Sequence, residues 1–129
     1  MSDPAALPFF FYGTFMRGES NHAALFLSDW TRYLGPASVR GLLYNLGDWP
    51  CAVPSPEGVI RGELHRIVDP SRVSDLDAFE DYDPLDPAGS EYIRVEVLLA
   101  DRSGLAWIYA YNRPVSGLPL IASGDWRKR

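Results

Sequence analysis

A glycine turn follows an apolar run near the start of the sequence and could bind an oxygen-bearing ligand. Residues Leu7–Tyr12 are nearly all apolar or aromatic, which predicts a short strand buried on both faces, and Gly13 ends this pattern. Backbone amides after a buried strand can point into a cavity, where glycine lets a ligand approach closely. Such fixed donors suit an anionic or polarised oxygen, although an ordinary strand-ending turn would have the same sequence. The four residues concerned are Tyr12, Gly13, Thr14 and Phe15.

An acidic residue, Glu80, ends a predicted apolar helical face directly after Phe79. A carboxylate at the edge of such a face can be half-buried, and the loss of hydration then raises its pKa toward neutrality. A carboxyl group with such a pKa can accept a proton and return it, which makes Glu80 the candidate general acid/base. A solvated acid at the end of a helix is the alternative interpretation.

Three further side chains could line the same pocket. Glu63 alternates within a predicted strand and could supply a second carboxylate, of the kind that glycosidases pair with a first, although strand glutamates usually face solvent. Arg94 and Tyr111 could hold a carboxylate of a substrate, or they could instead brace the sheet. These three residues are therefore secondary candidates.

The sequence indicates no metal site and no cofactor. His22 and His65 are the only histidines and Cys51 is the only cysteine, so no CxxC or HExxH spacing is present. We expect His22 to be structural within a helix, and Cys51 to be a buried or semi-buried thiol in a loop without a neighbouring base. The acidic residues at 81–86 lack the glycine and distal glutamate of a calcium loop, so we expect a solvated loop that could line the entrance.

The helices that would position these residues follow from local signals. A short helix is predicted over Glu19–Phe26, which lacks glycine and proline. Asp69 followed by Pro70 predicts the start of a second helix, because the carboxylate can cap free amides and proline suits the first helical position. The residues expected on the apolar face of this second helix are Val73, Leu76 and Phe79.

Strands are predicted where β-favouring residues recur between glycines and prolines. Two segments, Asp48–Gly58 and Asp81–Ser90, are predicted loops. The mixture predicts an α+β fold in which a small mixed β-sheet curls into a barrel-like shape flanked by a few helices. A chain of 129 residues fits one domain, which we place over residues 1–129. The predicted strand regions are Leu7–Tyr12, Trp30–Leu46, Val59–Val68, Glu91–Ala100 and Leu105–Tyr111.

Composition and charge exclude several classes of partner. The formal net charge of -5 argues against nucleic acid or an anionic membrane surface, because both attract stretches rich in Lys and Arg. The N-terminal apolar run is too short for a membrane span, and it is not preceded by the basic residues typical of a signal peptide. A single cysteine gives no sign of an oxidising compartment. We therefore expect a soluble cytoplasmic protein with a small-molecule substrate, and its oligomeric state stays open.

Several segments spread over nearly the whole chain, from Phe10 to Tyr111, form one pattern. They are Tyr12-Gly13-Thr14-Phe15-Met16-Arg17-Gly18-Glu19, Asn21-His22, Gly62-Glu63-Leu64, Leu76-Asp77-Ala78-Phe79-Glu80-Asp81-Tyr82, Tyr92-Ile93-Arg94 and Ala106-Trp107-Ile108-Tyr109. This pattern resembles the γ-glutamylcyclotransferase-like family, which includes the γ-glutamylamine cyclotransferases and the AIG2-like proteins. The YGT turn and the LDxFE helix end are fairly specific when they occur together.

The resemblance implies a small mixed sheet closing into a barrel, with a cavity between the glycine turn and the acidic helix end. It also implies that residues 12–15 bind the glutamyl part of the substrate and that Glu80 is the catalytic acid/base. The implied activity is the conversion of a γ-glutamyl amine, amide or peptide into 5-oxoproline and the free amine. The identity of the leaving amine stays open.

Two positions depart from the usual pattern of that family. Phe15 stands where leucine is more usual, and its bulk could narrow or reshape the pocket. Asp81 stands where glycine is common, and its negative charge would raise the pKa of Glu80 further if the two carboxylates were close.

The implied cyclisation makes few demands on the protein. The substrate's own α-amine attacks its γ-carbonyl, so the reaction needs no protein nucleophile, metal or water, and folding of the substrate supplies proximity. A base for the moving proton and donors for the oxyanion are still required, and Glu80 and the Gly13 turn could supply them. Two alternatives stay open: a non-catalytic binding or interaction protein of the same fold, and an acyl hydrolase or transferase acting on a γ-glutamyl linkage.

Overall fold

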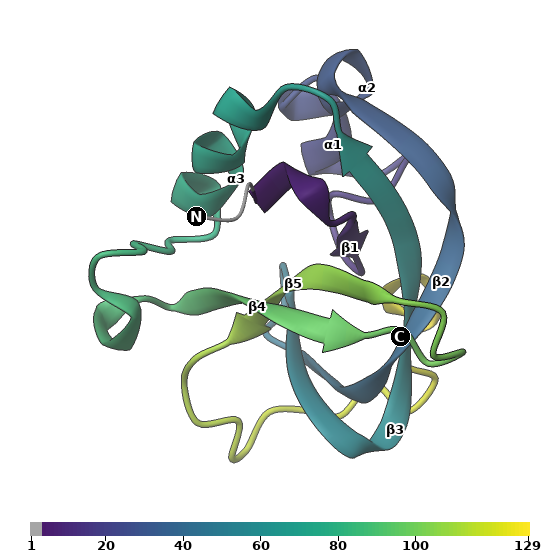
Figure 1. Ribbon diagram of the computed structural model, residues 1–129. Coiled ribbons are helices and arrows are strands. Elements are labelled where there is room, and N and C mark those ends of the chain that lie inside the picture. The colour runs from purple at the N-terminus through teal and green to yellow at the C-terminus, as the bar shows by residue number, and fades with distance from the viewer. Residues whose placement is uncertain (1–3) are drawn as a thin grey trace.

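Five strands form a mixed sheet in the computed structural model, which describes residues 4–129, so residues 1–3 of the predicted domain lie outside the described residues. The order is β2-β3-β1-β5-β4, in which β1 and β5 run parallel and the other neighbours are antiparallel. Helices accompany this sheet, which confirms the predicted α+β class (Figure 1). The strands are β1 (Phe9–Phe11), β2 (Thr31–Asn45), β3 (Pro50–Ile67), β4 (Tyr92–Leu98) and β5 (Leu105–Tyr111).

β2 and β3 form a long hairpin, and the predicted loop over Asp48–Gly58 is therefore wrong for most of its length. Asn45 pairs with Pro50 and Gly41 with Pro54, after which four residues of β3 bulge out before Arg40 pairs with Val59. Prolines are rare inside sheets because they lack a ladder donor. They are tolerated here because β1 pairs with β3 at residues 63–65, so the proline-rich part has a strand partner in β2 alone.

β1 lies in the middle of the sheet, which accounts for the apolar run that predicts it. All three of its phenylalanines are buried. Phe9 pairs with His65 of β3 on one side and with Trp107 of β5 on the other. A strand that is covered on both faces and paired along both edges needs apolar residues at consecutive positions. The chain therefore leaves the middle of the sheet at Phe11 and reaches Gly13 two residues later.

The two edge strands of the sheet meet at one point. Val39 of β2 forms an isolated bridge with Leu99, which follows β4, and the amide of Ala100 donates to the carbonyl of Ser38 at 2.8 Å. The strand order is thus that of an open sheet, but its curl brings the edges together. This shape agrees with the predicted barrel-like sheet.

Three short α-helices gather at one end of the curled sheet: α1 (Ser20–Ala24), α2 (Leu27–Trp30) and α3 (Val73–Phe79) (Figure 1). The helix predicted over Glu19–Phe26 ends earlier, because Phe26 adopts a left-handed conformation with φ of 53°. That break leaves Phe26 exposed and lets α2 bury Leu27 and Trp30. The burial of these two side chains explains the division into two helices.

Short 3-10 turns complete the secondary structure. Asp69 caps η2 (Pro70–Arg72) by accepting from the amide of Ser71 at 3.1 Å, and α3 follows directly, as the sequence predicts. The predicted loop after α3 contains η3 (Pro87–Gly89). Within residues 4–129, no helix has the length and apolar character needed to cross a bilayer. The remaining turns are η1 (Pro4–Ala6) and η4 (Trp126–Lys128).

Candidate active site

A cavity of about 190 Å³ lies where the segment after β1 faces the end of α3. Its volume is below the roughly 300–1,000 Å³ of pockets that hold drug-sized ligands, so it suits a small molecule. The cavity brings together the two segments that the sequence singles out. The turn contributes Tyr12, Gly13, Thr14 and Phe15, and the end of the helix contributes Phe79, Glu80 and Asp81.

Glu80 reaches the cavity wall because α3 ends at this residue. Its amide still donates to the carbonyl of Leu76 at 3.0 Å, and Asp81 then adopts a left-handed conformation with φ of 54°. Aspartate tolerates this conformation better than most residues other than glycine. The backbone at this position therefore explains why an aspartate can stand where the family pattern usually has glycine.

Asp77 fixes α3 to the sheet one turn before Glu80. Its buried carboxylate accepts hydrogen bonds from the guanidinium of Arg94, at 2.9 and 3.3 Å, and from the hydroxyl of Tyr109 at 2.7 Å. These bonds join α3 to both β4 and β5. Asp77 is not among the site residues predicted from the sequence, and its position beside the buried Leu76 was the available signal.

The environment of Glu80 prepares it for proton exchange near neutral pH. Burial raises the pKa of Glu80 from 4.5 to about 8, because little water is left to stabilise the charged form, and the negative charge of Glu91 adds to the rise. The sequence predicts the second effect for Asp81, but Glu91 is the carboxylate responsible. A pKa this close to neutrality allows both the acid and the carboxylate to be populated.

Residues at the start of α1 hold the glycine turn in place. The side-chain amide of Asn21 donates to the hydroxyl of Thr14 at 2.7 Å. Nδ1 of His22 lies 2.7 Å from the carbonyl of Phe15, so this nitrogen carries the proton and donates it. The backbone amide of His22 also donates to the carbonyl of Thr14 at 3.0 Å. His22 thus has the structural role that the sequence predicts.

Gly13 is needed for a close backbone approach. A Cβ atom at this position would lie 2.5 Å from Cγ of Pro50, which also lines the cavity. Within the described residues, the N–H groups of Gly13, Thr14 and Phe15 have no protein acceptor. These amides are therefore available to a ligand.

Aromatic side chains form much of the cavity wall. The ring of Phe15 lies 5.2 Å from that of Phe11 and 5.4 Å from that of Phe79, measured between centroids. The additional bulk of Phe15 relative to leucine is thus packed against neighbouring rings. Tyr12 donates from its hydroxyl to the carbonyl of Tyr109, which ties the turn to β5.

Three further titratable groups near the turn, Tyr12, Cys51 and Tyr92, are held in their neutral forms. Burial raises the pKa of Tyr12 and of Tyr92 above the ordinary value of 10. Burial also raises the pKa of the Cys51 thiol to about 11, and this cysteine lies in β3 instead of the predicted loop. Glu80 is therefore much better suited to proton exchange at neutral pH than these three groups are.

The secondary candidates do not line this cavity. Arg94 pairs with Asp77, and Tyr111 packs edge-on against Tyr92 with centroids 5.3 Å apart, so both brace the sheet. Glu63 is buried, contrary to the usual solvent-facing position of a strand glutamate, and it borders a separate depression. It is therefore not a second carboxylate in the cavity of Glu80.

Outside β1 and the end of α3, several residues of the cavity wall were not predicted from the sequence. They lie at the start of β3 and in or beside β4 and β5, where strand patterns alone did not reveal which side chains face the cavity. The inclusion of residues 92–94 and 106–109 in the family pattern was the available signal for two of them. The missed residues are Trp49, Pro50, Glu91, Tyr92 and Tyr109.

The arrangement can carry out two chemical tasks at once. Glu80 can take up or release a proton near neutral pH, and the unengaged amides of the turn can stabilise charge on an oxygen. Across residues 4–129, no three His, Cys, Asp or Glu side chains are grouped so that they could hold a metal ion.

Comparison with known proteins identifies the family. Residues 9–128 match the family described as gamma-glutamyl cyclotransferase, AIG2-like. The gamma-glutamylcyclotransferase family protein YtfP of Escherichia coli K12 is 40% identical over 124 residues, which cover 93% of this chain and 96% of that protein. The chain therefore belongs to the gamma-glutamyl cyclotransferase, AIG2-like family, as the sequence pattern predicts.

Solved structures agree with this assignment. The solution structure of ytfP from Escherichia coli has a TM-score of 0.68 at 36% identity, covering 93% of this chain and 96% of that chain. An aig2-like protein from Mus musculus has a TM-score of 0.66 at 21% identity, covering 88% of this chain and 84% of that chain. The second likeness shows that the fold is shared.

Proposed function

We propose that this member of the gamma-glutamyl cyclotransferase, AIG2-like family cyclises the γ-glutamyl group of an amine, amide or peptide and releases 5-oxoproline with the free amine. One observation carries the proposal: Glu80, with a pKa raised to about 8, lines the same small cavity as the glycine turn. Family membership alone does not fix an activity, so the pairing of these two groups is the essential support.

In the proposed reaction, the α-amine nitrogen of the substrate attacks its own γ-carbonyl carbon. A new C–N bond closes the five-membered ring, and the carbonyl oxygen becomes an oxyanion. Glu80, as the carboxylate, takes the proton from the attacking nitrogen and then, as the carboxylic acid, gives it to the leaving nitrogen. The C–N bond to the leaving amine breaks, the carbonyl reforms, and Glu80 returns to its ionised state.

The glycine turn is proposed to bind the glutamyl part of the substrate. The amides of Gly13, Thr14 and Phe15 can donate to the γ-carbonyl oxygen or to the α-carboxylate. Among the described residues that line the cavity there is no Lys, Arg or His, so backbone amides are the donors best placed for these oxygens. Tyr12 completes the turn and is fixed to β5 through its hydroxyl.

The proposed reaction proceeds without a covalent enzyme intermediate. The attacking nitrogen belongs to the substrate, and the cavity has only to fold the substrate and move one proton. Cys51, whose thiol stays protonated because burial raises its pKa to about 11, is not needed as a nucleophile. The physiological substrate in this proposal is a small γ-glutamyl compound of the cytoplasm, and the net charge of -5 gives no reason to expect a nucleic-acid partner.

A product assay tests this function directly. The purified protein would be incubated with a panel of γ-glutamyl amines and γ-glutamyl dipeptides, and 5-oxoproline, glutamate and new conjugates would be measured by mass spectrometry. Glu80→Gln keeps the shape of the side chain but removes proton transfer, and Glu57→Gln, on the exposed bulge of β3, is the matched control. We expect 5-oxoproline from the wild type and the control, with at least a 100-fold loss in Glu80→Gln.

Other products would support the alternative functions. Glutamate as the product would indicate a hydrolase, and a new γ-glutamyl conjugate would indicate a transferase. Saturable binding of γ-glutamyl compounds without any product would indicate a non-catalytic binding protein. Equal turnover by Glu80→Gln and the wild type would reject the role of Glu80.

A further inference from the structure

We propose that Glu63 and Arg127 are positioning residues that hold the glycine turn in its binding geometry by hydrogen-bonding to the backbone of Arg17. The inference rests on the proposed function, since it gives these side chains an indirect part in that reaction. Neither residue lines the cavity of Glu80. Both instead border a second, more open depression of about 700 Å³, together with Arg17. They would act on the turn from outside the cavity.

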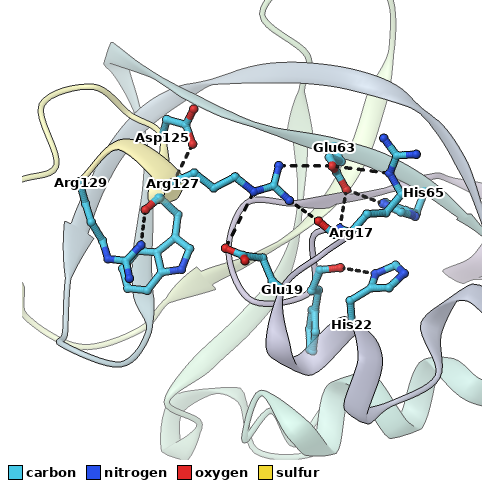
Figure 2. Close-up of polar contacts among 10 residues, drawn as sticks. Arg17, Glu19, His22, Glu63, His65, Asp125, Arg127 and Arg129 are labelled. Carbon is cyan, nitrogen blue, oxygen red and sulfur yellow. Dashed lines mark hydrogen bonds and ion pairs between the residues drawn. The ribbon is translucent and has the colours of Figure 1, made fainter.

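Both polar groups of the Arg17 backbone are bound by side chains from distant segments. The amide of Arg17 donates to Oε1 of Glu63, in β3, at 2.9 Å. The carbonyl of Arg17 accepts a hydrogen bond from the guanidinium of Arg127, in η4. Figure 2 shows Arg127 extending between Arg17, Glu19 and Glu63. We call this arrangement of Glu63, Arg127 and the Arg17 backbone the Arg17 anchor.

Glu63 is held firmly enough to serve as a fixed acceptor. Its side chain is buried, and Nε2 of His65 donates to Oε1 at 3.0 Å. Oε2 lies 3.6 Å from the guanidinium of Arg127 and 3.8 Å from that of Arg17. Burial alone would raise the pKa of Glu63, but the bonds from Arg17 and His65 and the nearby positive charge hold it below its usual value. The carboxylate therefore stays charged at neutral pH.

Arg127 is well placed to reach the turn from the end of the described chain. Its own backbone amide donates a hydrogen bond to the carboxylate of Asp125 at 2.9 Å, and the neighbouring Trp126 is buried. The guanidinium also lies 3.9 Å from the carboxylate of Glu19. The backbone of Arg127 is thus fixed. Its guanidinium contacts Arg17, Glu19 and Glu63. The Arg127 side chain remains partly exposed, at 42%, so replacing it leaves the core closed.

The anchor is connected to the cavity through two consecutive turns. The amide of Met16 donates to the carbonyl of Gly13 at 3.0 Å, and the amide of Glu19 donates to the carbonyl of Met16 at 3.0 Å. Met16 is shared by both turns and is buried. A shift of Arg17 would therefore be passed through Met16 to the amides that face the cavity. In reactions that depend on preorganised donors, a misplacement of about 1 Å can cost roughly 100-fold in rate.

A pair of arginines in η4 and just after it provides the main test. Arg127→Ala removes the bond to the Arg17 carbonyl, whereas Arg129→Ala removes an arginine that stacks on Trp126, 3.7 Å from its ring, and bonds to the Trp126 carbonyl. We expect kcat/KM for a γ-glutamyl substrate to fall about tenfold in Arg127→Ala and to stay within twofold of wild type in Arg129→Ala. The pH midpoint set by Glu80 should be the same in all three proteins.

Amide hydrogen exchange tests the same idea without any turnover. We expect the bonded amides of Met16, Arg17 and Glu19 to exchange at least tenfold faster in Arg127→Ala, while those of β3 and β5 keep their wild-type protection. Equal loss of protection throughout the protein would show a general stabilising role and overturn the proposal. Unchanged exchange at Met16, Arg17 and Glu19 would overturn it as well. If the wild type had no γ-glutamyl turnover, the proposed function would fail. The exchange experiment would still test whether the Arg17 anchor holds the glycine turn.

Substitutions at Glu63 provide a rescue test. Glu63→Gln keeps an oxygen that can accept from the Arg17 amide, whereas Glu63→Ala removes the acceptor. We expect Glu63→Gln to retain several-fold more kcat/KM than Glu63→Ala, and Arg127→Lys to retain more than Arg127→Ala. Circular dichroism and a thermal melt would confirm that each variant is folded. Equal activity of the folded Gln and Ala variants would contradict a positioning role for Glu63.

Discussion

The hydroxyl of Tyr109 donates a 2.7 Å hydrogen bond to the buried carboxylate of Asp77, and this bond holds α3 against β5 one turn before Glu80. The same carboxylate binds Arg94 of β4. The orientation of Glu80 is therefore set by the sheet as well as by its own helix. α3 spans Val73–Phe79, too short to be stable alone, so these contacts are needed to keep it folded.

Breaking this contact should loosen α3. In Asp77→Ala the guanidinium of Arg94, whose side chain is only 11% exposed, loses its carboxylate partner, and we expect the free energy of unfolding to fall by roughly 2–4 kcal/mol. Tyr109→Phe removes one hydrogen bond and should cost about 1 kcal/mol. Urea denaturation of both variants would measure these changes. Equal stability of Asp77→Ala and the wild type would contradict the structural role of Asp77.

The ionisation of Glu80 should be visible near pH 8. Its pKa is raised to about 8 by burial and by Glu91, so the carboxylate needed to accept the substrate's proton becomes populated as the pH rises through this value. We expect kcat/KM to increase from pH 6 to pH 8. Carbon-detected NMR of the Glu80 carboxyl group would give the pKa independently of turnover. A midpoint near 4.5 would show that the side chain is hydrated.

The same pKa shift makes stability depend on pH. Between about pH 4.5 and pH 8 the folded protein keeps a proton on Glu80 that the unfolded chain loses, so stability falls as the pH rises through this window and is level above it. Glu80→Gln cannot ionise, and we expect it to become more stable than the wild type by about 2 kcal/mol at pH 8.5, with little difference at pH 4.5. Parallel thermal melts at both pH values would measure the change.

The acidic entrance should influence which amine leaves. Asp81 and Glu91 line the cavity beside Glu80, so a cationic leaving group would be favoured over an anionic one. In Asp81→Asn we expect KM for a substrate with a cationic leaving group to rise by roughly 2–5-fold, and KM for a neutral one to change little. Steady-state kinetics at low and at high salt would test this, because salt should weaken the difference. An equal rise for both substrates would point to a change of shape.

Gly13 should tolerate no side chain. In Gly13→Ala the new methyl group would meet Cγ of Pro50 at 2.5 Å, so the turn must move away from Pro50. We expect kcat/KM to fall by roughly 10–100-fold. Gly104→Ala is the matched control, because a Cβ atom there has no neighbour within 4 Å. Wild-type kinetics in Gly13→Ala would exclude a role for close backbone approach at this turn.

Sequence features predicted the parts of the fold that depend on local signals. The continuous phenylalanines of β1 indicated a strand buried on both faces, and Asp69 with Pro70 marked the start of the turn that leads into α3. Each of these signals lies within a few consecutive residues, so no tertiary contact is needed to recognise it. The two segments of the cavity were identified for the same reason, with the family pattern placing them together.

The remaining features depend on contacts between distant segments. The first part of β3 resembled a loop because its prolines are acceptable only when no strand pairs with that edge, which sequence alone does not reveal. Glu63 was assigned to a strand, but its burial beside His65 and Arg127 follows from where η4 returns to the sheet. Asp77 is similar, because its partners lie in β4 and β5.

The position of β1 also affects how the chain can reach its folded state during synthesis. Phe9 of β1 pairs with His65 and with Trp107, so both of its neighbours are made much later than β1 itself. Until β5 emerges, three consecutive phenylalanines have no complete sheet to enter. Such long-range pairing slows folding and leaves a nascent chain exposed to aggregation. The strand that leads into the glycine turn is thus the one whose folding must wait for both of its neighbours.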